Sequence, residues 1–313
     1  MSWPRAEGVR VHWEDVPKPV RTALEDRLGT RVVEAQTQPQ GFSPGLAARL
    51  RLADGRRVFM KAVSEAANPD TPDIHRREAR ILAALPASIP APRLLWTYDA
   101  NGWVALCLED IEGRHPLEPW TEADLRIVIG TVTQMGADLT PSPVAVEWTA
   151  AHGFDKTING WQLALHRGER RLDAWCLRNL ERLARLESDA PAASAGDTLL
   201  HFDVRADNLL IAGDRVFVLD WPWARTGARW IDLVAMAPSV AMQGGPAPSE
   251  FLSRLDLGGV ADHAIDAVMC SMAGYFVVRS LEPAPQGIPT VRAFQAAQGR
   301  VALDWLRERT RWS

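Results

Sequence analysis

The chain has 313 residues, of which 47% are apolar and 24% charged, and 35 Lys and Arg against 39 Asp and Glu give a net charge of −4. This composition is that of a globular protein, which excludes a largely disordered chain, and the slight excess of acid does not suggest a nucleic-acid partner. The N-terminal residues lack the apolar core of a signal peptide, and the longest apolar stretch, 267–278, is shorter than a membrane span, so we expect no membrane partner.

The first predicted elements are two strands that flank a loop. Residues 31–36 and 46–53 show the alternating apolar pattern of strands. Asp54-Gly55 is a dipeptide that favours a tight turn, so 46–63 is predicted to be a β-hairpin.

The loop between these two strands contains Gly41, Ser43 and Gly45. Glycine lets backbone N–H groups approach a ligand closely, so these three residues are candidates for binding the phosphates of a nucleotide. A glycine-containing turn is usually only a turn, and this loop lacks the G-x-G-x-x-G pattern. The chain contains no Walker A sequence, which argues against a P-loop kinase.

Lys61 lies in an apolar strand, where an ammonium group is costly to bury without a partner. A helix that begins at Thr71-Pro72 supplies one, because Glu78 falls in the middle of its apolar stripe. We predict a buried ion pair that aims Lys61 at the α- and β-phosphates of a nucleotide. In the alternative interpretation Lys61 is an edge-strand charge and Glu78 is solvated, as Arg77 of the same helix is expected to be.

A second hairpin, formed by 93–98 and 103–108 around Asn101-Gly102, leads into a connector between two parts of the chain. An adenine docks on such a connector through main-chain groups, so side-chain identity carries little information there. By position we expect the carbonyl of Glu109 and the N–H of Ile111 to form hydrogen bonds with the adenine base.

Beyond the connector the pattern changes from strands to helices. A motif typical of a capping box at Thr121 begins one helix, and a second is predicted from about 171 to 187. The Pro-, Ala- and Ser-rich segment 189–196 is predicted to be a surface loop, and 198–201 a short strand that leads into the next segment.

Three cysteines, Cys107, Cys176 and Cys270, lie far apart in apolar patterns. Their spacing does not fit a zinc site, and their odd number does not suggest a set of disulfides. We therefore predict buried, reduced thiols and a cytoplasmic location.

The most informative segment is 201–208, which contains Asp203 and Asn208 and is followed by Asp220 at the end of an apolar strand. Phosphoryl transfer needs a carboxylate that takes the proton of the attacking hydroxyl, and an Asn oxygen and a second carboxylate that hold Mg²⁺ against the nucleotide phosphates. Asp203 is therefore the candidate catalytic base, and Asn208 and Asp220 are the candidate metal ligands. One Asp-x-x-x-x-Asn match carries almost no information by itself. Its position in the chain after the strand residue Lys61 and the helix residue Glu78 is informative.

At these residues the chain resembles the aminoglycoside phosphotransferase family, the small-molecule branch of the protein-kinase-like fold, from about residue 31 to the C-terminal helices. The resemblance implies an α+β, two-lobed protein-kinase-like fold. Its N-terminal lobe, 1–110, would hold a five-stranded antiparallel sheet with one main helix, and its C-terminal lobe, 111–313, would be mostly helical. It also implies that ATP or GTP binds with Mg²⁺ in the cleft and that a hydroxyl of a small substrate is phosphorylated.

Other residues depart from the protein-kinase pattern. Trp221-Pro222 follows the metal-binding Asp in place of Phe-Gly, and only eleven residues separate Asp220 from Asp232, too few for a segment that docks a peptide. We expect Asp232 to brace the catalytic loop from a helix start and His201 to be a structural hydrogen-bonding residue. For Arg205, Arg225 and Arg229 three roles stay open: contact with phosphate or an anionic substrate, bracing of the site, or a solvated position.

The acceptor is the least constrained part of the prediction. The resemblance suggests an aminoglycoside or another hydroxylated antibiotic, but polycationic aminoglycosides need an acid-lined pocket. The segment 155–187, which is expected to add substrate contacts, has seven Lys and Arg against five Asp and Glu. A metabolite kinase for a sugar or an amino alcohol is therefore an alternative, and a non-catalytic nucleotide-binding scaffold is another.

Overall fold

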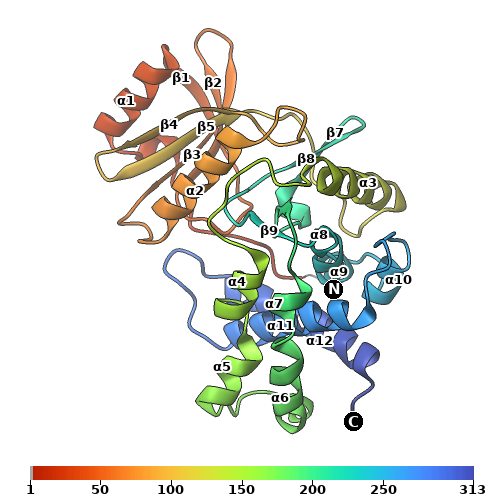
Figure 1. The fold of residues 1–313 in the computed structure, drawn as a ribbon. Coiled ribbons are helices and arrows are strands. Elements are labelled where there is room, and N and C mark those ends of the chain that lie inside the picture. The colour runs from red at the N-terminus through yellow and green to blue at the C-terminus, as the bar shows by residue number, and fades with distance from the viewer. Residues whose placement is uncertain (1–2) are drawn as a thin grey trace.

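The computed structural model describes residues 3–313, and its N-terminal part is built on one antiparallel sheet with the strand order β1-β2-β3-β5-β4 (Figure 1). The strands are β1 (Val32–Thr37), β2 (Leu46–Leu52), β3 (Arg57–Ser64), β4 (Leu94–Ala100) and β5 (Trp103–Glu109). The predicted five-stranded antiparallel sheet is confirmed.

Two tight turns fix the hairpins of this sheet. Between β2 and β3, Gly55 has a φ of 89°, and the N–H of Arg56 donates to the Asp54 carboxylate over 3.0 Å. Between β4 and β5, Asn101 and Gly102 have φ values of 55° and 72°. Glycine and asparagine adopt this left-handed region more readily than other residues, which is why the two dipeptides predicted the hairpins correctly.

Different helices cover the two faces of the sheet, because alternate residues of a strand point to opposite sides. In β3, Met60 and Ala62 pack in the core beneath α1 (Lys18–Leu28). Lys61, between them, points to the opposite face, where α2 (Thr71–Ala84) lies. The predicted main helix is α2. The sequence analysis did not identify α1, which covers the other face.

The rest of the chain is mostly helical, with α11 and α12 packed against each other above α5 and α6 (Figure 1). Its helices are α3 (Glu122–Asp138), α4 (Ala150–Lys156), α5 (Gly160–Arg167), α6 (Ala174–Glu187), α7 (Ala190–Ala193), α8 (Ile231–Ala235), α9 (Ala237–Met242), α10 (Pro248–Leu252), α11 (Asp262–Ser280) and α12 (Val291–Thr310). Two small antiparallel pairs interrupt the helices, β6 (Thr198–Leu200) with β9 (Arg225–Gly227) and β7 (Leu209–Ala212) with β8 (Arg215–Val218).

The structure confirms the helix predicted from about 171 to 187, with a later start, and corrects the predicted loop 189–196. Helix α6 begins at Ala174 and not near 171, because the side chain of Asp173 caps it by accepting from the N–H of Cys176 over 2.8 Å. The segment 189–196, predicted to be a surface loop, contains α7, and its Ala190 and Ser194 are buried. Alanines and a proline in the first helical turn suit a short helix start.

The chain enters the fold from the helical side. Trp3 Nε1 donates to Glu118 Oε2 over 2.8 Å, and the N–H of Val9 donates to the carbonyl of Gly287 over 2.9 Å. Figure 1 shows this N-terminal end beside the C-terminal helices, before the chain crosses to α1. The predicted division near residue 110 stays a prediction, and these contacts cross it.

The three cysteines are unpaired and buried, so the predicted buried thiols are confirmed. Across residues 3–313, no helix has both the length and the apolar character needed to span a bilayer.

Candidate active site

A cavity of about 360 Å³ lies between the sheet and the helical part. Its apolar walls come from both sides and include Ala47, Phe59, Leu82, Leu108, Leu210 and Leu219. Its polar end contains Lys61, Glu78, Asn208 and Asp220. A concave volume of this size, mostly apolar with a few convergent polar groups, is typical of a small-molecule site.

The predicted ion pair of Lys61 and Glu78 is confirmed. Lys61 Nζ lies 2.7 Å and 2.9 Å from the two carboxylate oxygens of Glu78, a buried residue. Lys61 Nζ also contacts the carboxylate of Asp220. Burial alone would lower the pKa of Lys61, but Asp220 and Glu78 raise it above its ordinary value. Burial raises the pKa of Glu78 and Lys61 opposes this, while Lys61 holds the pKa of Asp220 below its ordinary value against burial.

The catalytic loop brings Asp203 and Asn208 together. Asn208 Nδ2 donates to the Asp203 carbonyl over 2.8 Å and to its carboxylate over 3.1 Å. Because this side chain uses its amide nitrogen toward Asp203, its Oδ1 is left to face another ligand. Asn208 and Asp220 line the cavity, and Asp203 lies beside that wall, attached to it through Asn208.

Asp232 and His201 hold this loop in place, as predicted. Asp232, in the first turn of α8, accepts the N–H groups of His201 and Phe202, each over 2.8 Å. His201 Nε2 is 2.7 Å from the carbonyl of Leu219, and its Nδ1 accepts the N–H of Asp203 over 3.2 Å. Burial lowers the pKa of His201 to about 4, so the ring is neutral, and both of its nitrogens are engaged.

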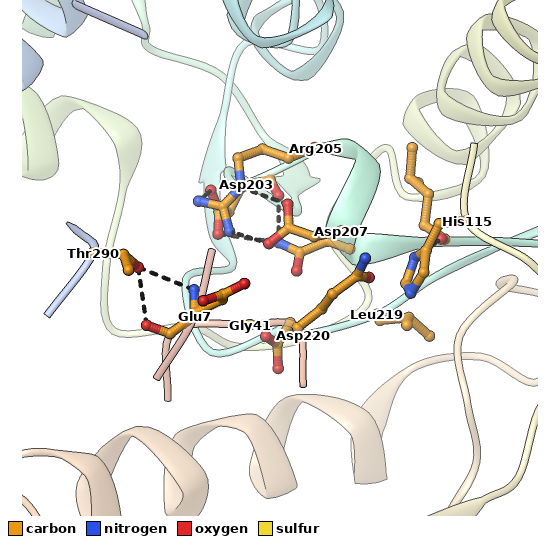
Figure 2. A network of polar contacts seen from close by, with 12 residues as sticks. Glu7, Gly41, His115, Asp203, Arg205, Asp207, Leu219, Asp220 and Thr290 are labelled. Atoms are coloured by element: carbon orange, nitrogen blue, oxygen red, sulfur yellow. Dashed lines mark hydrogen bonds and ion pairs between the residues drawn. The ribbon is translucent and has the colours of Figure 1, made fainter. Parts of the chain in front are cut away.

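The electrostatics of Asp203 suit a proton acceptor. Burial raises its pKa to about 7, while the guanidinium of Arg205, 3.1 Å away, opposes the rise. Figure 2 shows Arg205 between Asp203 and Asp207, and its second contact, to Asp207, is 2.9 Å. These two contacts agree with a bracing role for Arg205, and its contact with phosphate or an anionic substrate stays a prediction. Asp207 was not identified from the sequence.

The loop of Gly41, Ser43 and Gly45 differs from the prediction. Gly41 and Ser43 line the cavity, but Gly45 does not. The N–H groups of Gly41 and Gly45, which were expected to face phosphates, donate instead to the carbonyls of Ala6 and Val9 over 2.8 Å and 3.0 Å. Gly45 is needed for packing, since an added Cβ would lie 2.4 Å from the carbonyl oxygen of Ala62 in β3. Its φ of 108° also favours glycine.

Arg10 is the main residue of this site that sequence analysis missed. Its side chain lines the cavity and donates through Nε to the carbonyl of Gln38 over 2.9 Å and through Nη2 to that of Gly41 over 3.1 Å, with further contacts to the carbonyls of Gln40 and Ser43. The alternation of apolar and polar residues in 8–12 indicates an extended segment, but not where it docks.

The connector residues Glu109 and Ile111 both line the cavity, as the prediction for the nucleotide base requires. Within residues 3–313, no backbone or side-chain group accepts a hydrogen bond from the N–H of Ile111. This donor is therefore available to a ligand. The assignment of these two residues to a base stays a prediction.

Arg77 and Arg225 lie outside the cavity and contact aromatic rings instead of carboxylates. Arg77, predicted to be solvated, packs 3.4 Å from the centre of the Trp148 ring, and burial lowers its pKa. That prediction is wrong, because α2 presents this side chain to an aromatic surface. Arg225 donates Nε to the carbonyl of Trp223 over 3.2 Å and lies over the Phe202 ring, and burial, aided by Arg77, lowers its pKa to about 10.

The donor set at the polar end fits a magnesium ion. Residues 3–313 contain no cluster of three or more His, Cys, Asp or Glu side chains that could hold a metal by themselves. Mg²⁺ commonly takes one or two protein oxygens and completes its shell with water and substrate phosphates. The Asn208 Oδ1 and the Asp220 carboxylate would supply two such oxygens.

Comparison with known proteins agrees with this geometry. The model of a family described as the phosphotransferase enzyme family matches residues 40–266. No curated protein matches the chain.

Several solved structures with the same fold are described as small-molecule kinases and have low sequence identity to this chain. A choline/ethanolamine kinase family protein from Mesorhizobium loti is 16% identical, with a TM-score of 0.58 over 93% of this chain and 94% of that one. An amicoumacin kinase in complex with AMP-PNP, Ca²⁺ and Ami is 9% identical, with a TM-score of 0.56 over 90% and 93%. An aminoglycoside phosphotransferase from Streptomyces rimosus in complex with ADP and streptomycin is 15% identical, with a TM-score of 0.50 over 90% and 99%. At these identities the likeness shows the kinase-like fold.

Proposed function

This chain belongs to the phosphotransferase enzyme family and is a small-molecule kinase, and from this premise we propose that it transfers the γ-phosphoryl group of ATP or GTP to a hydroxyl of a small molecule. The observation that carries the proposal is that Asn208, Asp220 and Lys61 lie at the polar end of one cavity, with Asp203 directly beside it and hydrogen-bonded to Asn208. Two of the solved structures of this fold contain an adenine nucleotide or its analogue, and one contains a divalent cation.

Each side chain has a role that its position supports. Asp203, with a pKa raised by burial, accepts the proton of the attacking hydroxyl. Lys61, fixed by Glu78, contacts the phosphates. Asn208 and Asp220 would hold Mg²⁺, which supplies neutralisation of the phosphate charge. The apolar walls of the cavity hold and orient the nucleotide base and keep water away from it.

We propose an antibiotic as the acceptor, an aminoglycoside or another hydroxylated compound. A second candidate, a metabolite kinase for a sugar or an amino alcohol, is favoured by the excess of basic residues in 155–187, which does not suit a polycationic acceptor. A non-catalytic scaffold has no support, since the base and both candidate metal ligands are present.

Asp203→Asn tests the proposal, with Asp214→Asn in the exposed β7–β8 turn as the matched control. Phosphate incorporation is measured with ATP and GTP in parallel against a panel of hydroxylated antibiotics, sugars and amino alcohols. Loss of a general base lowers turnover by about 10²- to 10⁴-fold, whereas the affinity for the nucleotide is expected to change little. Full turnover in Asp203→Asn, or no phosphorylation of any acceptor by the unaltered protein, would contradict the proposal.

A further inference from the structure

The phosphate end of the cavity is closed by a segment that precedes the first helix. Residues 6–11 run between the loop 38–45 and the segment 286–290, and contact both. On one side Gly41 and Gly45 pair with this segment through backbone hydrogen bonds of 2.8–3.0 Å. On the other side the backbone of Glu7 bonds to the Thr290 hydroxyl over 3.1 Å and 2.9 Å, a contact drawn in Figure 2.

Close packing holds this segment in a single position. A Cβ on Gly8 would lie 2.3 Å from the carbonyl oxygen of Phe42, and a Cβ on Gly287 would lie 2.9 Å from Pro44. Only glycine allows the backbones to approach this closely, so residues 8 and 287 fit a three-layered arrangement of loop, N-terminal segment and C-terminal segment. Arg10 is therefore delivered into the cavity from a fixed backbone.

The loop presents the wrong groups to bind phosphate by itself. Its carbonyls at Gln38, Gln40, Gly41 and Ser43 point to the Arg10 guanidinium. Carbonyl oxygens repel phosphate oxygens, and the two glycine N–H groups that could attract them are already bonded. A guanidinium that donates to these carbonyls reverses the sign of the potential that a phosphate meets there.

The position of Arg10 is also set by charge. Its side chain lines the same cavity as Lys61 and Asp220. Burial lowers its pKa, and Asp220 is the charge that opposes this. Within residues 3–313 no carboxylate forms an ion pair with Arg10, so its charge is available to an anion that enters the cavity.

We propose that Arg10 is a second phosphate-positioning cation, which bridges the carbonyls of loop 38–45 to the phosphates of the bound nucleotide. This inference rests on the proposed function, since it takes a nucleoside triphosphate as the ligand. It assigns phosphate recognition to residues 6–11, whereas the sequence analysis expected the N–H groups of Gly41 and Gly45 to provide it.

The test compares binding of a nucleoside triphosphate with that of its nucleoside, each titrated in the presence of Mg²⁺. The unaltered protein is first titrated with ATP and GTP, and the one that binds is used with its own nucleoside. Arg10→Gln is the variant, and Arg5→Gln is the control, because Arg5 is exposed and immediately precedes residues 6–11. Each protein is first checked for folding by circular dichroism and thermal unfolding.

In Arg10→Gln the affinity ratio of triphosphate to nucleoside is expected to fall at least about tenfold, since a charge-assisted hydrogen bond is lost. The affinity of Arg10→Gln for the nucleoside is expected to stay unchanged. In the control Arg5→Gln the affinity ratio is also expected to stay unchanged. If Arg10 only fastens the loop, the variant loses nucleoside and triphosphate affinity alike and the ratio is preserved, which would overturn the inference.

A second variant covers the case in which Arg10→Gln does not fold. Arg10→Lys keeps the charge, but a single ammonium cannot reach several carbonyls and a phosphate at once. Its ratio is expected to fall at least about threefold, and an unchanged ratio would refute the bridging role. If the unaltered protein binds neither ATP nor GTP, the proposed function itself fails, and this outcome is distinct from an unaffected ratio in the variants.

Discussion

Replacing Lys61 by methionine should destabilise the fold chiefly through Glu78. The Glu78 carboxylate is buried, and Lys61 is the cation that both of its oxygens contact. Asp220, the other partner of Lys61, is one-third exposed, so water can solvate it when the lysine is removed. The cost of Lys61→Met is therefore the cost of leaving one buried carboxylate without its cation.

The magnitude has an upper bound, because a buried carboxylate can take up a proton. Protonating a glutamate of ordinary pKa at pH 7 costs about 3.5 kcal/mol, and at pH 5 it costs less than about 1 kcal/mol. In the variant the folded-state pKa of Glu78 lies above the unfolded one. Stability is therefore kept below the unfolded pKa and is lost as the pH rises. We expect a loss of about 3.5 kcal/mol at pH 7, or a fall of about 5 °C in the melting temperature.

Chemical or thermal unfolding at pH 5 and pH 7 measures this effect. Glu78→Gln added to Lys61→Met should recover about 2–3 kcal/mol at pH 7, because the buried charge is then gone. Lys156→Met is the control, since Lys156 is exposed and should change stability by less than about 0.5 kcal/mol. An equal loss at both pH values, with no recovery in the double variant, would refute the argument that Lys61 neutralises a buried Glu78.

Three further outcomes are expected. Because burial raises the pKa of Asp203 to about 7 and the base must be unprotonated, kcat/KM should fall about tenfold per pH unit below pH 7, and a profile that stays flat to pH 5 would argue against this base. Asp232→Asn can accept only one of the two catalytic-loop N–H groups, so the free energy of unfolding should fall by about 1–3 kcal/mol together with kcat; unchanged unfolding would show that the brace is dispensable. Gly45→Ala should lower the melting temperature measurably, because its Cβ would lie 2.4 Å from the Ala62 carbonyl at a φ of 108°, and wild-type stability would contradict that clash.

The parts of the fold that were predicted correctly are those encoded by local signals. Turn dipeptides gave both hairpins of the sheet, and a carboxylate in the apolar stripe of α2 identified Glu78 as the partner of Lys61. Asp232 was found by the same logic, since an acid at a helix start next to a loop has few other roles. In each case a short stretch of sequence marked the residue, although the partners of Glu78 and Asp232 lie 17 and 31 residues away.

The residues that were missed make contacts that no local window contains. Arg10 meets the loop about thirty residues later, and Glu7 meets Thr290 at the opposite end of the chain. The carbonyl orientation of loop 38–45 follows from this docking, so the expected free N–H groups of its glycines could not be checked from the sequence. Arg77 was misplaced because the aromatic ring it covers belongs to a distant segment.

The contact of Glu7 with Thr290 has a consequence for how the protein is made. The sheet leaves the ribosome well before residue 290 has been added, so the early chain can form strands but lacks the outer layer that pins residues 6–11. We therefore expect a prematurely released chain to be inert toward nucleotide. Competence would arise only after residue 290 has been added, when residues 6–11 and 286–290 come together.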